Sequence, residues 1–380
     1  MQDFVIIAGK KYRKGYTTGS CAAAASKAAA AMLLRGGILE SIEIDTPAGI
    51  RLNLPVTDVT VGEDVAKCCV VKDGGDDPDV TTGLKIYAEV RKRKQEGIFV
   101  SAGQGIGRVT QPGLKVEVGS PAINPVPMKM IRKEVGEVLK EGEGVDILLS
   151  VPGGEEVAKM TYNPRLGIEG GISILGTKGI VEPMSEEAWK ESLALELDML
   201  SAKGRDTVVM VFGNYGEDFV ENILQIPTEG VVKISNFVGY MLEAASSRGF
   251  KQVLLAGHMG KLIKVAAGIF HTHSRVADAR MEILCAYAAL EGADRNTVEA
   301  IYSCNTTDAA ARIIRQKGLE GIYRRVVEQV SSRCERYVFQ RLQVGSVLFN
   351  EDNALLCMDE KAAGILQKIK EGMGCKGQSI

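Results

Sequence analysis

The sequence predicts a strand-rich α+β domain over residues 1–180, followed by a doubly wound, Rossmann-like α/β domain over residues 181–380 with a helical C-terminal part. Three observations predict this fold class. Short apolar runs separated by turn residues dominate the first part, which has few long helices, as in α+β proteins. Strand-like and helix-like segments alternate in the second part, which is typical of a parallel sheet. Between them, residues 163–185 (NPRLGIEGGISILGTKGIVEPMS) hold five glycines, which indicates a connection made of turns and close backbone contacts.

The composition is that of a soluble globular protein, with 45% apolar and 25% charged residues among 380. The net charge of −2 and the single tryptophan argue against a basic or aromatic nucleic-acid-binding surface. No apolar run approaches the roughly 18 residues that span a bilayer, and the first residues do not resemble a signal peptide. We therefore expect a cytoplasmic protein whose eight cysteines, without a C-x-x-C pair, are reduced thiols.

An alanine-rich helix is predicted over residues 17–35, because alanine has the highest helix propensity and Gly36-Gly37 forms a C-terminal stop. Ser20 is the expected N-cap. Two interpretations of the helix stay open. It is either a close-packed helix without chemistry, or its start is an anion site at Thr17, Thr18 and Ser20, beside free backbone N–H groups.

A hairpin is predicted next, with strands at residues 42–44 and 50–54, and then a strand over residues 65–72. That strand runs into an acidic loop, KDGGDDPDVTTG, which carries Asp73, Asp76, Asp77 and Asp79. Carboxylates this close repel one another unless cations, donors or water separate them. The loop is either a solvated turn or a site for an ammonium, ribose hydroxyls or ring N–H groups, and its spacing does not fit an EF-hand.

The glycines within residues 98–107 do not form a dinucleotide-binding motif, because Arg108 stands at the last glycine position and no helix follows. A helix is predicted at residues 129–141. Residues 145–150 and 156–161 are predicted to pair as a second hairpin around a Pro-Gly-Gly turn.

The second part begins with a predicted helix and continues as alternating strands and helices. The predicted segments are helix 186–203, strand 207–212, strand 231–234, helix 237–248, strand 252–256 and a C-terminal hairpin within 337–357. Ligands of such sheets bind at the carboxyl ends of the strands. Residues 257–261 (GHMGK) are not a phosphate-binding P-loop, because the glycines are too close and the Ser or Thr is missing.

All three histidines lie between residues 258 and 273. His271 and His273 stand two positions apart without nearby acids, which is a weak metal motif. Polar contacts to a substrate rank above metal binding, so no metal site is predicted.

Six stretches of the chain carry a family resemblance. They are GYTTGSCAAAASKAA (15–29), KDGGDDPDVTTG (72–83), GIGRVTQPGL (105–114), PAINPVP (121–127), NPRLGIEGGISILGTKGIV (163–181) and GHMGKLIKVAAGIFHTHSRVADAR (257–280). In this order they resemble the CbiD family, the cobalt-precorrin-5B C-1-methyltransferases of anaerobic cobalamin (vitamin B12) synthesis. Met128, Lys178 and Phe270-His271 depart from the family pattern, which puts individual contacts in question.

The resemblance implies transfer of a methyl group to carbon 1 of cobalt-precorrin-5B, giving cobalt-precorrin-6A. S-Adenosylmethionine is the implied cofactor, and cobalt enters only as part of the substrate. The implied partners are the tetrapyrrole substrate and other enzymes of cobalamin synthesis, without nucleic acid or membrane. Because the methyl donor is already activated, the protein mainly aligns two ligands and excludes water, so no catalytic triad is expected.

The candidate site residues follow from the charges of these ligands. Those expected to contact the substrate, chiefly its carboxylates, are Thr17, Thr18, Ser20, Arg165, Lys178, Lys261, His273, Ser274 and Arg275. Those expected to hold the cofactor are Asp73, Asp76, Asp77, Gly170, Gly171, Ser173, Gly176 and Thr177. His258 is the candidate for acid–base assistance.

Two alternatives stay open. A tetrapyrrole-modifying enzyme of the same pathway that needs no methyl donor would act without S-adenosylmethionine. A non-catalytic carrier of corrinoid intermediates would bind the macrocycle tightly and show no cofactor affinity. The sequence leaves open which domain binds the cofactor and what the oligomeric state is.

Overall fold

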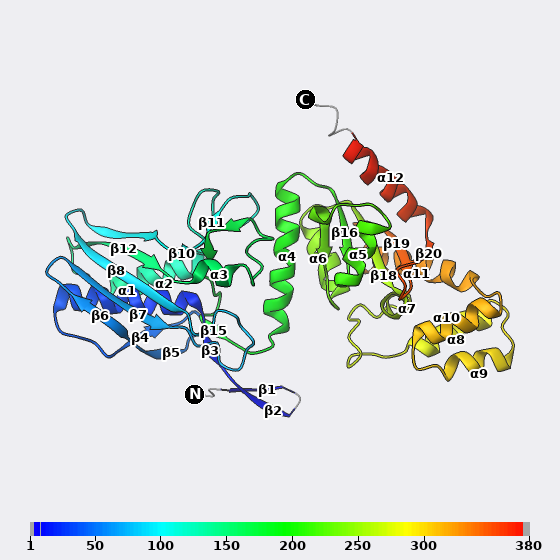
Figure 1. The fold of residues 1–380 in the computed structure, drawn as a ribbon, viewed down its shortest axis with the longest axis horizontal. Helices are drawn as coiled ribbons and strands as arrows, with labels where there is room; N and C mark the ends of the chain where they lie inside the picture. Colours follow the sequence, from blue (N-terminus) through cyan, green and yellow to red (C-terminus); the bar gives the residue numbers. More distant parts are fainter. Residues whose placement is uncertain (1–3, 8, 375–380) are drawn as a thin grey trace. The chain divides into compact units, whose positions relative to one another are not determined.

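The computed structural model describes residues 4–7 and 9–374, and the chain divides into two compact units, Met1–Glu186 and Glu187–Ile380 (Figure 1). Strands and helices are mixed in both. The seven cysteines within the described residues are free thiols. In the same part of the chain, no helix combines the length and the apolar character that crossing a membrane requires.

Unit 1 is built on a five-stranded sheet in the order β6-β7-β8-β12-β9. Its strands are β6 (Thr57–Val61), β7 (Val65–Val71), β8 (Lys85–Arg93), β12 (Gly144–Ser150) and β9 (Gly97–Ala102). Neighbouring strands are antiparallel, except that β12 and β9 are parallel. Ile86, Ala88 and Val90 of β8 are fully buried, and the residues between them are half-buried. This alternation places one face of the sheet on the core.

Helix α1 (Thr18–Arg35) packs on that face against β7, β8 and helix α2 (Pro125–Gly136). Seven of its eight alanines are fully buried, so the small side chains bring the helix close to the sheet. The predicted helix is confirmed, and its close-packed interpretation holds. The predicted N-cap is wrong, because Thr17 accepts the Ser20 N–H (3.2 Å) and the hydroxyl of Ser20 is turned to another segment.

The first predicted hairpin is confirmed as β4 (Ser41–Asp45) and β5 (Arg51–Pro55), which are antiparallel. The second is wrong: residues 156–161 form no strand, and helix α3 (Gly154–Ala158) follows β12. Strand β12 already has β8 on one edge and β9 on the other, so neither edge is left for a hairpin partner. Helix α2 starts earlier than expected because Pro125 occupies its first turn, where proline is tolerated.

Short strands complete unit 1 in pairs β1-β2, β15-β3, β11-β13 and β10-β14. They are β1 (Phe4–Ile7), β2 (Lys10–Arg13), β3 (Gly15–Tyr16), β10 (Gly105–Ile106), β11 (Arg108–Val109), β13 (Ile168–Glu169), β14 (Gly171–Ile172) and β15 (Ile180–Val181). The last three belong to the glycine-rich stretch, which therefore pairs with strands distant in the sequence.

Unit 2 has one five-stranded sheet in the order β17-β16-β18-β19-β20. Its strands are β16 (Thr207–Val211), β17 (Val231–Lys233), β18 (Gln252–His258), β19 (Gln343–Phe349) and β20 (Leu355–Met358). The first four strands in this order are parallel, and only β20 runs antiparallel. The predicted alternation of strands and helices is confirmed.

Helices cover both faces of this sheet. Val208 and Met210 of β16 face a core shared with α4 (Glu186–Ala202), α6 (Val238–Ser247), α7 (Met259–Ala266) and α11 (Gly321–Tyr337). Val209 and Val211 face the opposite core, which α5 (Asn214–Asn222) and α12 (Glu360–Gly374) close. The remaining elements are η1 (Thr228–Gly230), α8 (Arg280–Leu290), α9 (Arg295–Tyr302) and α10 (Thr307–Gln316).

Candidate active site

The acidic loop of unit 1 is held by the protein itself. Asp73 forms a two-pronged ion pair with the guanidinium of Arg13 (2.6 and 2.8 Å), whose hydrogen bond lowers the pKa of Asp73. Asp76 accepts the backbone N–H of Arg13 (2.6 Å), and Asp77 accepts that of Met184 (3.0 Å). The predicted cofactor role of these three carboxylates gains no support, because each already accepts a hydrogen bond from another segment of the chain.

The start of α1 is likewise bonded within unit 1. The Thr17 N–H donates to the carbonyl of Gly179 (3.2 Å), and the Ser20 hydroxyl donates to the same oxygen (2.7 Å). The Thr18 hydroxyl accepts the N–H of Leu175 (2.9 Å). All three predicted residues are buried. This arrangement corrects the expectation of an anion site, since the groups that would bind the anion bind the glycine-rich stretch instead.

Several glycines of that stretch are packing positions. A Cβ on Gly171 would lie 2.3 Å from the carbonyl carbon of Gly105, across the β10–β14 pair. A Cβ on Gly176 would lie 2.3 Å from the hydroxyl of the residue that caps α1. Ser173 is buried and donates to Asn163 Oδ1 (3.2 Å). Bare backbone is therefore needed here for contact with the protein's own chain.

Apart from Asp76, whose carboxylate accepts the Arg13 N–H, four predicted residues of unit 1 are exposed. They are Arg165, Gly170, Thr177 and Lys178. Their exposure keeps them as candidates for ligand contacts.

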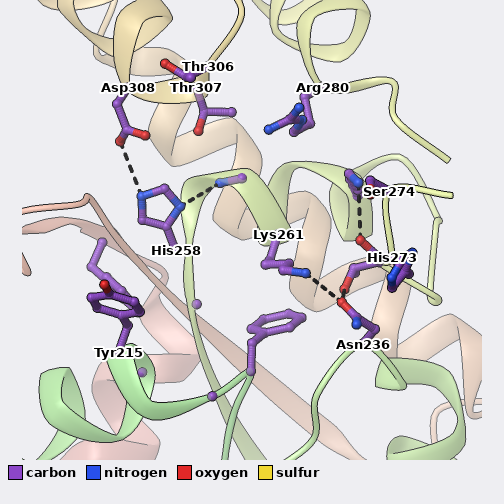
Figure 2. A pocket seen from close by; sticks show the side chains of 18 of the residues that line it. Tyr215, Asn236, His258, Lys261, His273, Ser274, Arg280, Thr306, Thr307 and Asp308 are labelled. Atoms are coloured by element: carbon purple, nitrogen blue, oxygen red, sulfur yellow. Dashed lines mark hydrogen bonds and ion pairs between the residues drawn. The ribbon is translucent and has the colours of Figure 1, made fainter. Parts of the chain in front are cut away.

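Unit 2 has a cavity of about 750 Å³ at the carboxyl end of its parallel sheet (Figure 2). Residues that line it lie at or just after the carboxyl ends of β16, β17, β18 and β19. Others lie at the N-termini of α5, α7 and α10. The residues that line the cavity include Gly213, Tyr215, Asn236, His258, Lys261, Lys264, His273, Ser274, Arg280, Thr307 and Asp308.

The cavity brings together His258, Lys261, His273 and Ser274, four of the predicted residues, whereas Arg275 is not part of its lining. Sequence reasoning missed several others. Asn236 closely follows a strand, so its position at a strand end was a usable signal. Arg280 is the last residue of the matching stretch 257–280 but was not among the predicted site residues. Asp308 belongs to the helical region, where no motif marks it.

His258 is fixed through both ring nitrogens. Its Nδ1 accepts the N–H of Gly260 (3.1 Å) and so caps α7. Its Nε2 lies 3.2 Å from Asp308 Oδ1, at ion-pair distance, and neither atom makes a hydrogen bond within the described residues. The Nδ1 lone pair is already used, so acid–base assistance by His258 is restricted to Nε2, which faces a carboxylate.

Lys261 is the cation with the least compensation in this cavity. Its Nζ donates to Asn236 Oδ1 (2.6 Å) and has no carboxylate at ion-pair distance among the described residues. By contrast, Arg280 is paired with Asp278 (2.6 Å). Burial, followed by the positive charges of Lys264 and Arg280, lowers the pKa of Lys261. An anion would stabilise its charged form.

We expect the Lys261 amine to titrate below the ordinary range of lysine, and Arg280→Gln to raise that pKa part of the way back because burial remains. Only the ammonium form attracts an anion, so anion binding here should weaken as the pH rises through the lowered pKa. NMR of ¹³C-dimethylated lysines, assigned with Lys261→Arg, measures the titration. An ordinary lysine pKa for Lys261 that stays the same in Arg280→Gln would contradict this electrostatic account.

Comparison with known proteins covers both units. The family model described as CbiD matches residues 6–183, and the one described as CbiD, C-terminal domain, matches residues 271–360. A protein of Alkaliphilus metalliredigens (strain QYMF) is 48% identical over 97% of this chain and 98% of its own. One of Thermoanaerobacter sp. (strain X514) is 55% identical over 90% and 94%. Both are named cobalt-precorrin-5B C(1)-methyltransferase.

A crystal structure of the cobalamin biosynthesis protein cbiD from Archaeoglobus fulgidus is 27% identical and covers 73% of this chain and 88% of its own, with a TM-score of 0.38. The sequence relationships are much closer and extend over nearly the whole chain. This protein therefore belongs to the CbiD family.

Proposed function

We propose that this protein transfers a methyl group from S-adenosylmethionine to carbon 1 of cobalt-precorrin-5B. The supporting observation is the 48% identity over 97% of the chain with a relative named for this reaction. A shared fold alone would not imply a shared reaction. Here the similarity in sequence also extends over 370 residues of the chain.

The residues of the chain have a limited chemical task in this reaction. When bound, S-adenosylmethionine supplies an activated methyl carbon, because its sulfur keeps the electron pair of the carbon–sulfur bond that breaks. The macrocycle supplies the attacking carbon. The protein therefore has to bind and orient both molecules and exclude water, a task that requires no nucleophilic side chain.

The loop of residues 272–277 is our candidate for binding the acetate and propionate carboxylates of the substrate. It carries His273, Ser274 and Arg275. Lys264 holds this loop, since its Nζ donates to the carbonyls of Thr272 (3.2 Å) and Ala277 (2.7 Å). Arg165 and Lys178 of unit 1 are further candidates, because both are exposed cations.

The finer fold prediction is compatible with this role. We propose that residues 1–180 act as an α+β domain and residues 181–380 as a Rossmann-like domain. A parallel sheet with helices on both faces, as in unit 2, binds ligands at the carboxyl ends of its strands.

The test is an oxygen-free incubation of the purified protein with cobalt-precorrin-5B and methyl-labelled S-adenosylmethionine. We expect a product heavier by one labelled methyl group in the mass spectrum, with the label at carbon 1 by NMR. A bound but unchanged macrocycle would instead support a carrier. A changed macrocycle without the label would support a donor-independent enzyme.

A further inference from the structure

Most of the residues expected to hold the cofactor in unit 1 already make contacts within the protein. Asp73, Asp76 and Asp77 bind Arg13 or the backbone of Met184, and the hydroxyl of Ser173 binds Asn163. A buried ligand site needs polar groups with unused bonding capacity. The cavity of unit 2 offers them.

The position of this cavity fits a cofactor site. Strand β16 lies between β17 and β18, so the chain leaves β16 toward one edge of the sheet and later returns to β18 on the other side. The segments that follow β16 and β18 both line the cavity. Such a reversal of strand order opens a crevice in which parallel sheets bind nucleotide-like ligands.

The size of the cavity favours the donor over the macrocycle. Its volume of about 750 Å³ lies within the range of roughly 300–1,000 Å³ that is usual for sites of drug-sized ligands. S-Adenosylmethionine has that size, whereas a cobalt-bound tetrapyrrole with its acid chains is much larger.

The distribution of charge also matches the donor. Figure 2 shows Lys261 and Arg280 on one side of the cavity and Tyr215 with the His258–Asp308 pair on the other. Lys261 has no carboxylate partner among the described residues, and Asp308 Oδ1 is buried without a hydrogen bond there. S-Adenosylmethionine carries a carboxylate and an ammonium at one end and a sulfonium charge further along, so its carboxylate can bind Lys261 while a cationic group faces the side of Asp308.

Tyr215 and Gly213 provide surfaces for the rest of the molecule. Tyr215 is 75% exposed although it lines the cavity, so its ring is open to a flat ring or a cation. A Cβ on Gly213 would meet nothing within 4 Å, which leaves open space beside the backbone at the start of α5.

We propose that the cavity of unit 2 is the methyl-donor site, with Lys261 binding the donor carboxylate and Tyr215 facing its sulfonium. This inference rests on the proposed function and specifies which unit binds the donor. Asn236 is a positioning residue, because its Oδ1 holds Lys261 Nζ at 2.6 Å.

Isothermal titration calorimetry of the full chain with S-adenosylmethionine and S-adenosylhomocysteine tests this assignment. Lys261→Met is expected to lower the affinity for both ligands by about ten- to a hundredfold, because both have the carboxylate. Tyr215→Leu is expected to weaken S-adenosylmethionine by about three- to tenfold and the homocysteine analogue less, because only the former carries the sulfonium charge.

Matched variants separate ligand contacts from damage to the fold. Lys251→Met removes an exposed lysine next to the opposite end of β18 and should leave both affinities unchanged. Gly213→Val fills the open space and should weaken both ligands. Gly364→Val on α12, where an added Cβ also meets nothing within 4 Å, should not.

The inference is overturned if Lys261→Met and Gly213→Val bind both ligands like the wild type. It is also overturned if Lys261→Met weakens only the binding of uroporphyrin III, a polycarboxylate tetrapyrrole. The cavity would then bind substrate carboxylates. Labelled methyl transfer with unchanged donor affinity in both variants would refute the site and leave the function intact. A wild-type protein that binds neither donor ligand and transfers no methyl group would refute both.

Discussion

Gly171→Ala is expected to lower the free energy of unfolding by about 3 kcal/mol or more, without any ligand present. The physical reason is the contact between β10 and β14. The new Cβ would lie 2.3 Å from the carbonyl carbon of Gly105 and 2.6 Å from the N of Ile106. Both atoms belong to backbone, which cannot rotate away as a side chain can, so the two strands must separate.

The adjacent residue provides a matched control. A Cβ on Gly170 would meet nothing within 4 Å, but its φ of +82° disfavours an L-residue, so Gly170→Ala should cost only about 1–2 kcal/mol. Urea unfolding followed by circular dichroism measures both variants, and hydrogen exchange in β10 and β14 localises the effect. Wild-type stability of Gly171→Ala combined with weaker donor binding would return Gly171 to the ligand site.

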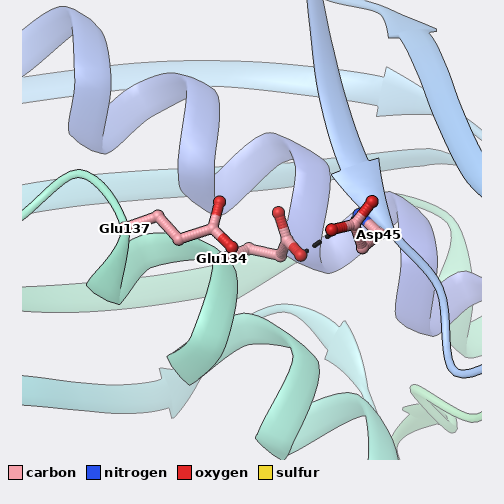
Figure 3. A group of neighbouring side chains, drawn as sticks. All are labelled: Asp45, Glu134 and Glu137. Atoms are coloured by element: carbon pink, nitrogen blue, oxygen red, sulfur yellow. Dashed lines mark hydrogen bonds between the residues drawn. The ribbon is translucent and has the colours of Figure 1, made fainter.

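Lys27→Met is expected to destabilise the protein by about 3 kcal/mol, because it leaves a buried carboxylate without its cation. Asp45, Glu134 and Glu137 gather beside α1, as Figure 3 shows. The Lys27 ammonium lies 2.7 Å from Glu134 and 2.8 Å from Glu137, and the side chain of Glu134 is only 1% exposed. The lysine thus supplies the positive charge that this acidic group requires.

The expected loss is at the lower end for a broken buried ion pair, because Lys133 remains 3.5 Å from Glu134. Lys133→Met is the matched control. Its side chain is 55% exposed, so it should cost less than about 1 kcal/mol. The double variant Lys27→Met/Glu134→Leu should recover most of the loss, since both charges are then absent. Equal effects of the two lysine variants in thermal or urea unfolding would contradict this account.

Local pattern accounts for the parts of the fold that could be predicted. The alanine-rich α1, the β4–β5 hairpin and the alternation of strands and helices in unit 2 all follow from residue periodicity and turn residues within a short window. The hairpin expected after β12 failed for a non-local reason. The first strand of that predicted hairpin exists as β12. Its two edges are occupied by β8 and β9, which lie elsewhere in the sequence, so residues 156–161 cannot pair with it.

The candidate site likewise combines residues that are close in the sequence with one that only the fold brings near. His258, Lys261, His273 and Ser274 lie close together in the sequence and line one cavity, so a local search could group them. Asp308 joins them only because the fold brings the start of α10 to the end of β18. No spacing in the sequence expresses that contact.

The sequence by itself determined the family, the class of reaction it implies and the alternation of elements, because these depend on residue identity and short-range periodicity. Only the tertiary structure decided which polar groups are already used. Thr18 bonds to Leu175, Asp73 to Arg13 and Gly171 packs on Gly105, over separations of 60 residues or more. Such contacts consume hydrogen-bonding capacity and space that the residue types alone appear to offer. Among the described residues, the ammonium of Lys261 keeps no carboxylate partner, and it lies beside an open cavity in unit 2.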